Sequence, residues 1–206
     1  MDAIFETFKL RAQAVSTEVH HFPRKNDALD FILHYLRDAG VSAAPQSYAV
    51  WAQCPFLEGV DRRQLSTALP GLTFDVNREV SALAKVGISQ LDWAIANTGT
   101  LVQDATPVDQ RLVSTLPLIH IALVRSDHLV PDLPSALTRI RPERTNYISF
   151  ITGPSRTADI ERVLTIGVHG PEKLIIIFFD EVSFDEVLHD EVSFDEVSSD
   201  APGSVN

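Results

Sequence analysis

The segment from Ile148 to Pro171 constrains the fold of this chain more than any other part of the sequence. An apolar run at 147–152, rich in β-branched residues, ends at Gly153-Pro154, and a polar turn then leads into the start of a helix. A second turn, which ends in Gly170-Pro171, precedes another apolar run at 174–179. This order of strand, turn, helix start, glycine corner and strand is typical of an α/β protein.

The polar turn after the first of these runs offers hydrogen-bond donors to an anion. Ser155, Arg156 and Thr157 lie just before the expected helix start. Free backbone N–H groups at a helix start attract negative charge, and hydroxyl and guanidinium groups beside them can donate to the same anion. The segment contains neither a GxxxxGK[ST] nor a GxGxxG string, so it is weak evidence for a nucleotide site when taken alone.

The rest of the chain also alternates short amphipathic helices with apolar strands. We expect helices at 1–18, 28–39, 60–69, 78–86, 109–117 and 132–140, and strands at 47–52, 72–76, 94–96, 100–102 and 118–124. A further brief helix, capped by Ser89, is expected to carry Asp92. The adjacent His20 and His21 read as a solvated linker, because no metal-ligand partner follows at a usual spacing. This alternation predicts a three-layer α/β sheet.

Charge divides the chain into a body and a tail. The net charge is −11, from 17 basic and 28 acidic residues. Nine of the acidic residues lie in the segment 180–206, which has no Lys or Arg, so the body is near neutral and gives no argument for nucleic-acid binding. The tail repeats with a period of five, which fits neither helix nor strand. We therefore expect an N-terminal helical segment at 1–45, an α/β domain at 46–180 and a disordered acidic tail at 181–206, whose removal should leave folding intact.

Cysteine content and hydropathy exclude several classes of protein. The single cysteine, Cys54, excludes an internal disulfide and an iron–sulfur cluster held by this chain alone, and it reads as a buried thiol. No apolar run approaches the roughly 18 residues of a membrane span. The N-terminus lacks the pattern of a secretory signal, so a cytoplasmic location is expected. We expect no metal or cofactor to be bound by this chain.

Two stretches resemble one protein family. The string ITGPSRTADIE with GVHGPEKL, and the glycine-aspartate-threonine pattern between Gly87 and Leu101, are similar to the lactate-utilisation (LUD) domain, closest to its lactate utilisation protein C group. The resemblance covers most of residues 70–180. It implies a mostly parallel sheet like that of the sugar-phosphate isomerase and CoA-transferase group. One departure is Asn97, where the family pattern has an acidic residue, and this counts against acyl transfer to CoA.

The same resemblance points to ligand-binding positions. They are bend, loop and helix residues of the matching motifs: Thr98, Gly99, Thr100, Arg111, Gly153, Pro154, Ser155, Arg156, Thr157, Asp159, His169 and Gly170. Our central hypothesis is that the bends near residues 98 and 154 face one crevice and bind an anion together. The alternative for Thr98–Thr100 is a tight bend needed only by the sheet, and for Arg111 the cap of a surface helix.

Catalytic residues remain open at this point. The candidates are His169, His120 and Asp92. A histidine between glycines can approach a ligand closely, which favours His169, although a turn histidine can also bond the local backbone. A lone histidine in an apolar strand, such as His120, is more often a hydrogen-bonded core residue than a catalyst.

Two functions from different classes follow. The resemblance implies a cluster-free accessory subunit of a three-part system that oxidises L-lactate to pyruvate, whose partner subunits carry the iron–sulfur clusters. Such a subunit would bind a small anionic ligand, its partners, or both. The alternative is a stand-alone enzyme, isomerase-like or ligase-like, acting on a phosphorylated or carboxylated metabolite. There His169 or His120 would be the general base, with Asp92 or Asp159 as its partner. A third, blander reading is that these corners only build the sheet.

Overall fold

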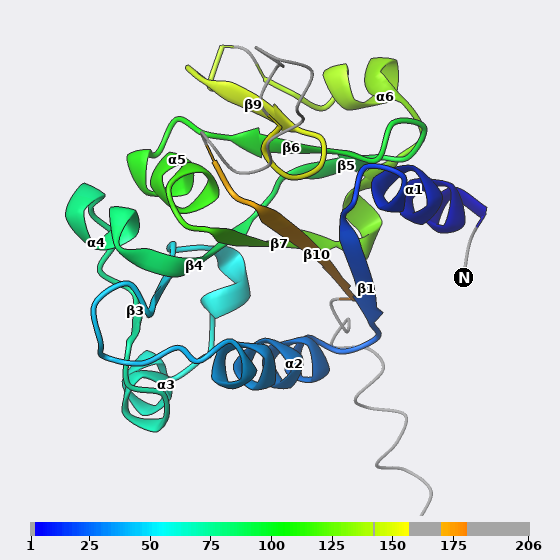
Figure 1. The fold of residues 1–206 in the computed structure, drawn as a ribbon. Coiled ribbons are helices and arrows are strands. Elements are labelled where there is room, and N and C mark those ends of the chain that lie inside the picture. Colours follow the sequence, from blue (N-terminus) through cyan, green and yellow to red (C-terminus); the bar gives the residue numbers. More distant parts are fainter. Residues whose placement is uncertain (1–2, 142, 157–169, 181–206) are drawn as a thin grey trace, which may run out of the picture.

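A computed structural model describes residues 3–141, 143–156 and 170–180, and it shows an α/β fold built on two sheets (Figure 1). Over these residues the main sheet has six strands, all parallel, in the order β1 (Glu18–Phe22), β10 (Lys173–Phe179), β7 (Ile119–Arg125), β4 (Ala84–Gln90), β2 (Tyr48–Trp51) and β3 (Leu72–Thr73). The second sheet has the order β8 (Leu129–Val130), β5 (Trp93–Ile95), β6 (Thr100–Asp104) and β9 (Ile148–Ile151).

Both faces of the main sheet are covered, as a parallel sheet requires. Figure 1 shows α2 (Lys25–Asp38) and α3 (Arg62–Ala68) below it, and α1 (Ala3–Gln13), α5 (Val108–Thr115) and the second sheet above it. Two smaller helices, α4 (Arg78–Ala82) and α6 (Leu133–Leu137), contact α5 and β5 respectively. The short 3-10 turns are η1 (Pro55–Leu57) and η2 (Ser126–His128). The prediction of a three-layer, mostly parallel α/β fold is confirmed.

The apolar core follows from the strand sequences. β7 and β10 are apolar on both faces, and the β10 side chains from Leu174 to Phe179 are all buried. Alternate β10 residues face opposite sides: Ile175 and Ile177 pack in the cluster under α2, whereas Ile176 and Phe178 pack against α1. Burying a large apolar side chain contributes about 1.5–3 kcal/mol, so these central strands supply much of the driving force for folding.

The connections of the main sheet create one place for a ligand. After β2 the chain continues outward to β3, whereas after β4 it returns through the second sheet to β7, on the opposite side. Neighbouring strands whose connections leave in opposite directions open a crevice at their carboxyl ends, and open α/β sheets bind their ligands there. In this fold the crevice lies beyond Trp51 and Gln90, the last residues of β2 and β4.

Several predicted elements are wrong, each for an identifiable reason. Residues 18–22 are not a linker after a long helix: α1 ends at Gln13, Ser16 has φ +66°, and β1 then pairs with β10. The expected helix capped by Ser89 is the end of strand β4, which pairs with β2 and β7, and the Ser89 hydroxyl lies against His120 of β7. The helix predicted at 78–86 ends at Ala82, because the same strand starts at Ala84.

The run at 147–152 is a strand, as predicted, but it does not belong to the parallel sheet. As β9 it pairs antiparallel with β6, with Leu101 opposite Ile151 and Asp104 opposite Ile148. Gly153 therefore follows an antiparallel strand of the second sheet and does not lie at the carboxyl edge of the parallel sheet. The remaining predicted strands at 47–52, 72–76, 94–96, 100–102, 118–124 and 174–179 are present, although several are shorter than expected.

Two glycines let the end of α1 approach the second sheet. Gly99 has φ +66° and Gly153 has φ +76°, a region that favours glycine. A β-carbon on Gly99 would lie 2.5 Å from the backbone N of Ala12, and one on Gly153 would lie 2.9 Å from the carbonyl oxygen of Val15. Gly59 has a similar φ of +75°, but a β-carbon there would meet nothing within 4 Å.

This contrast gives a matched test. We expect Gly99→Ala and Gly153→Ala to lower the free energy of unfolding by about 2–4 kcal/mol, because each adds a clash to the cost of a positive φ. Gly59→Ala carries only the backbone cost, about 1–2 kcal/mol. Chemical denaturation of the three variants checks this, and equal losses would mean that close packing of α1 is unimportant.

Candidate functional site

The structure brings the two predicted bends together. The Thr100 hydroxyl lies 2.8 Å from the Thr152 hydroxyl, and the Ser155 N–H donates to the Pro171 carbonyl at 2.8 Å. A β-carbon on Gly170 would lie 3.1 Å from the Ser155 β-carbon. The bend at 98–100, the turn at 152–155 and the corner at 170–171 are thus neighbours, and we call them the bend cluster. Thr157, Asp159 and His169 lie outside the described residues.

Much of the described part of the bend cluster packs against the end of α1 and the residues that follow it. Gly99 and Gly153 both face the end of α1, as described above, and Pro154 is buried. Thr98 and Arg156 are exposed. The interpretation as a tight bend that the fold needs is therefore supported for Gly99, while anion binding at this cluster remains a prediction.

Arg111 is held by its own surroundings. Its guanidinium Nη1 donates to the Ala105 carbonyl at 2.7 Å and lies 3.5 Å from the Thr106 carbonyl. The same guanidinium lies over the Tyr147 ring, 5.4 Å from its centroid. These contacts tie α5 to the segment that follows β6, so Arg111 has a structural role in addition to any role with a ligand.

His120 lies inside the main sheet. It is 1% exposed, and its Nε2 lies 2.8 Å from the Ser89 hydroxyl on the neighbouring strand β4. Burial lowers the pKa of His120 from 6.5 to about 4, so the ring is neutral at pH 7. The interpretation as a hydrogen-bonded core histidine agrees with this geometry, because the ring has no path to a ligand on the surface.

Acid stability tests this assignment. As the pH falls from 6.5 towards 4, His120 takes up a proton in the unfolded chain but stays neutral in the folded chain, where its pKa is about 4. The free energy of unfolding should therefore fall by about 3 kcal/mol over that range through this residue. We expect His120→Gln to flatten the decline in melting temperature between pH 7 and pH 4. His34→Gln, a change at an exposed histidine of α2, should leave the decline unchanged, and identical profiles for all three proteins would contradict the assignment.

The crevice between β2 and β4 is lined by polar side chains. It has a volume of about 270 Å³. It is bounded by residues at or just after the carboxyl ends of β2, β4 and β6, one residue of α5 and a histidine of η2: Gln53, Cys54, Pro55, Gln90, Leu91, Asp92, Asp104, Pro107, Gln110 and His128. We call it the switch-point crevice. Burial raises the pKa of the Cys54 thiol, so this cysteine stays protonated and unreactive at neutral pH, in agreement with the prediction of a buried thiol.

A buried polar chain connects His120 to this crevice. Ser89 lies between the His120 ring and the Gln103 amide, which is 3.3 Å from the Ser89 hydroxyl. The Gln103 amide also lies 3.4 Å from the Gln110 side-chain oxygen, and the Gln110 amide donates to the Gln53 carbonyl at 3.0 Å. The wall of the crevice is therefore held by hydrogen bonds that begin in the middle of the sheet.

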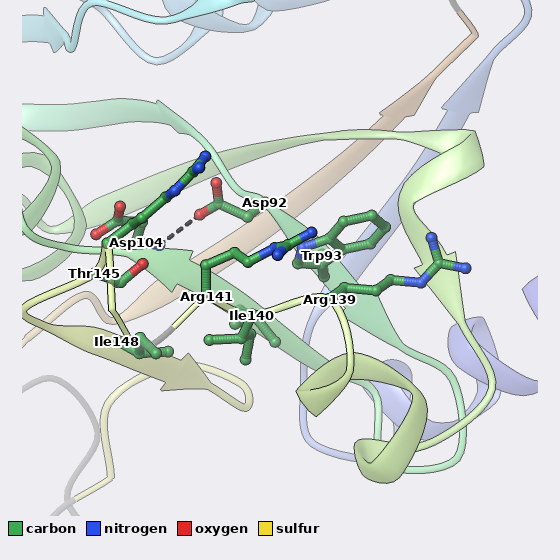
Figure 2. Close-up of a pocket in the computed structure, with 10 residues that line it drawn as sticks. Asp92, Trp93, Asp104, Arg139, Ile140, Arg141, Thr145 and Ile148 are labelled. Atoms are coloured by element: carbon green, nitrogen blue, oxygen red, sulfur yellow. Dashed lines mark hydrogen bonds between the residues drawn. The ribbon is translucent and has the colours of Figure 1, made fainter.

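Asp92 and Asp104 separate this crevice from a second pocket. That pocket has a volume of about 230 Å³ and is lined mainly by the second sheet and the segment after α6: Asp92, Trp93, Val102, Asp104, Arg139, Ile140, Arg141, Arg144, Thr145 and Ile148. We call it the arginine pocket. Figure 2 shows Asp92 and Asp104 close together, joined by the hydrogen bond from the Asp104 backbone N–H to the Asp92 carboxylate.

The Asp92 carboxyl has an altered affinity for protons. Asp92 as a whole is exposed, but protein atoms surround its carboxyl group, and this burial raises the pKa of the carboxyl above its usual value. The negative charge of Asp104 raises the pKa of Asp92 further. The Asp104 backbone N–H and the neighbouring His128 oppose it. Solvent on the open side limits the shift, so Asp92 is an acceptor at neutral pH with a higher proton affinity than an ordinary aspartate.

A stack of side chains supports the wall of both pockets. The Trp93 ring stacks on the His128 ring, at 4.4 Å between centroids, and the Arg139 guanidinium lies over the Trp93 ring, 4.8 Å from its centroid. His128 Nδ1 also lies 2.7 Å from the Asp92 carbonyl. The stack fixes the backbone around Asp92 and holds Arg139 at the rim of the arginine pocket.

The bend cluster and Asp92 lie at opposite ends of one hairpin. Trp93 pairs with Val102 at the open end of β5 and β6, next to Asp92 and Asp104, whereas Thr98 and Gly99 form the turn at the closed end. The strand between them is roughly 10 Å long. A single small ligand cannot contact Asp92 and Gly99 together, so the predicted residues divide into two places.

Comparisons with known proteins identify the fold around these pockets. A model of the LUD domain matches residues 5–179, which include both sheets and both pockets. The chain belongs to the LUD domain family. Its structure is also similar to that of a DUF162 family protein from Deinococcus radiodurans, with a TM-score of 0.58 and 21% identity over 85% of this chain and 96% of that one.

Several relatives of this LUD domain share one name. Lactate utilization protein C of Exiguobacterium sp. is 36% identical over 114 residues, which are 52% of this chain and 50% of that protein. The proteins of the same name from Macrococcus caseolyticus (39% over 111 residues, 51% and 48%) and Bacillus subtilis (38% over 104 residues, 48% and 43%) are similar. The chain thus spans about half the length of the curated relatives that it matches.

Sequence reasoning missed several residues around the LUD domain's pockets. Trp93, Asp104 and His128 were not candidates, because each becomes a pocket residue only through the pairing of β5 with β6 and β8. The available signal was the string Leu91-Asp92-Trp93 directly after an apolar strand. Among the described residues no group of three or more His, Cys, Asp or Glu side chains is placed to hold a metal ion. In that same part of the LUD domain, no helix is long and apolar enough to span a bilayer.

Asp92 gives this site a testable signature. Because the raised pKa means that the folded protein disfavours the charged carboxyl, Asp92→Asn should raise the melting temperature at pH 7. The penalty disappears once Asp92 is protonated, so the gain should vanish as the pH falls below about 3. Asp75→Asn, at an exposed aspartate, should show no such gain. Calorimetry at both pH values checks this, and a loss of stability at pH 7 would contradict it.

Proposed function

We propose that this chain is a cluster-free accessory subunit of a lactate-utilisation system, one that binds partner subunits, a small anionic ligand, or both. The observation that carries the proposal is the match of the LUD domain over residues 5–179, together with relatives named lactate utilization protein C. The name belongs to those relatives. It is extended to this chain as a proposal, because the chain covers about half of their length.

The chemistry of the residues favours an accessory role over a role in electron transfer. The single cysteine of these 206 residues, Cys54, is buried with a raised pKa and would be a poor cluster ligand. Electron transfer from lactate would then use iron–sulfur clusters on partner subunits, in the cytoplasm. The part of the chain that the structure describes would supply binding surfaces and the two pockets around Asp92.

A second function is favoured by one observation. Asp92 combines a raised pKa with a position at the carboxyl end of β4, next to the place where the connections of the sheet diverge. Perturbed carboxyls in such crevices often act as acids or bases. The alternative is therefore a stand-alone enzyme that acts on a phosphorylated or carboxylated metabolite with Asp92 as its base.

Reconstitution tests the first function against the second. We expect the purified chain, mixed with cluster-bearing lactate-utilisation proteins, to co-elute with them and to change the rate of L-lactate oxidation. Cluster-bearing proteins of an unrelated pathway serve as the control for nonspecific association. Turnover of a sugar phosphate or carboxylate by the chain alone, lost in Asp92→Asn, would favour the enzyme. Absence of both co-elution and any effect on lactate oxidation would overturn the subunit proposal.

A further inference from the structure

The arginine pocket combines three kinds of surface. The carboxylates of Asp92 and Asp104 lie on the side of the β5–β6 hairpin, and three arginines come from the segment after α6 (Figure 2). Most of the remaining lining is apolar: Trp93, Val102, Ile140 and Ile148. The volume of about 230 Å³ lies below the roughly 300–1,000 Å³ of sites for drug-sized ligands. The pocket therefore suits a small ligand that carries both charges and an apolar part.

The positive wall holds two guanidinium groups that are available to a ligand. Arg139 already lies over the Trp93 ring. Among the residues that the structure describes, the Arg141 and Arg144 side chains make no hydrogen bond, ion pair or ring contact. The turn that carries them is fixed, because the Arg141 carbonyl accepts the N–H groups of Arg144 at 2.9 Å and Thr145 at 3.1 Å. Guanidinium groups bind carboxylates through parallel hydrogen bonds, so this wall is suited to a carboxylate.

The negative wall has two carboxylates with oxygens to spare. Asp92 Oδ2 accepts the Asp104 N–H, and Asp104 Oδ1 accepts the Thr106 N–H at 2.9 Å. The other oxygen of each carboxylate makes no hydrogen bond to another described residue. A cation between two like charges relieves their repulsion, which a neutral hydroxyl does not. An ammonium group also carries three N–H donors, enough to bond both oxygens.

We propose that the arginine pocket binds a small zwitterionic amino acid. Its carboxylate would lie on Arg141 and Arg144, its ammonium between Asp92 and Asp104, and its side chain against the apolar lining. The small volume requires the two charges to lie close together, as they do in an α-amino acid. A molecule with a single charge leaves one wall unpaired. This inference rests on the contacts of the pocket and goes beyond the lactate-utilisation proposal.

Matched ligands test the site on the purified chain of 206 residues. We expect L-valine to bind with a dissociation constant on the order of 1 mM, because charge pairs at exposed positions are individually weak. Isovalerate lacks only the ammonium of valine and isobutylamine lacks only its carboxylate, so each should bind at least about tenfold more weakly. The α-hydroxy analogue of valine should also bind more weakly, because its hydroxyl leaves the two carboxylates without a cation.

The two tryptophans give a local readout by NMR. The Trp93 ring lines the pocket, whereas Trp51 is fully buried in the core cluster under α2. We expect valine to shift the indole N–H signal of Trp93 and to leave that of Trp51 unchanged. Binding of valine without a shift at Trp93 would place the ligand elsewhere and overturn the site.

Substitutions assign each charge of the ligand to its wall. Arg141→Gln with Arg144→Gln should weaken valine binding at least about tenfold and leave isobutylamine binding no weaker than in the wild type. Asp92→Asn with Asp104→Asn should weaken valine binding to a similar extent, about tenfold, without weakening isovalerate binding. A variant with a damaged pocket would lose both ligands of a pair, so this pattern separates recognition of a charge from a loss of structure.

Controls and contrary outcomes are defined in advance. Arg37→Gln and Asp75→Asn change the same residue types at other exposed positions and should leave valine binding unchanged. The site would be lost if the wild-type chain bound no valine, because the two walls would then neutralise each other. Equal binding of valine and its singly charged or α-hydroxy analogues, or equal valine binding by all variants, would also exclude it. None of these results bears on the lactate-utilisation proposal, which reconstitution with cluster-bearing proteins tests separately.

Discussion

The burial of a parallel sheet on both faces is the constraint on which this structure depends. β7 and β10 carry almost no polar side chain, so water must be excluded above and below them. With α2 on one side and α1, α5 and the second sheet on the other, the connections have to cross the sheet on opposite faces. The chain also leaves β2 and β4 in opposite directions, and the switch-point crevice lies where these two connections diverge.

Close backbone contacts then set the positions of the covering elements. At Gly87 a β-carbon would lie 2.1 Å from the carbonyl oxygen of Val113, so glycine alone lets α5 rest directly on β4. Gly99 and Gly153 do the same for α1 on the second sheet. The buried chain from His120 through Ser89 to Gln103 pairs His120 Nε2, the Ser89 hydroxyl and the Gln103 amide nitrogen away from water, although His120 Nδ1 and Gln103 Oε1 have no partner among the described residues. Packing and polar pairing thus support the same arrangement.

The sequence predicted the class of fold and most of its elements because these depend on local periodicity. The apolar run at 174–179 could be assigned as a strand without knowing its neighbours, and so could the helix at 28–39. Ser89 was misread as a helix cap because its role depends on His120, which is distant in sequence. The same limit applies to the site: Asp92 was named as a candidate, but Asp104 and Arg141 come together with it only through strand pairing and the turn after α6.

β10 has a further consequence for how the molecule assembles. It is inserted between β1 and β7, so Glu18 meets no sheet neighbour until Ile175 is available. Contacts between residues so far apart in the sequence form slowly, because a long loop must close first. On the ribosome, β1 would wait with an unpaired edge until nearly the whole domain had emerged. The last strand therefore completes the main sheet, because pairing of β10 with both β1 and β7 joins the two ends of the domain.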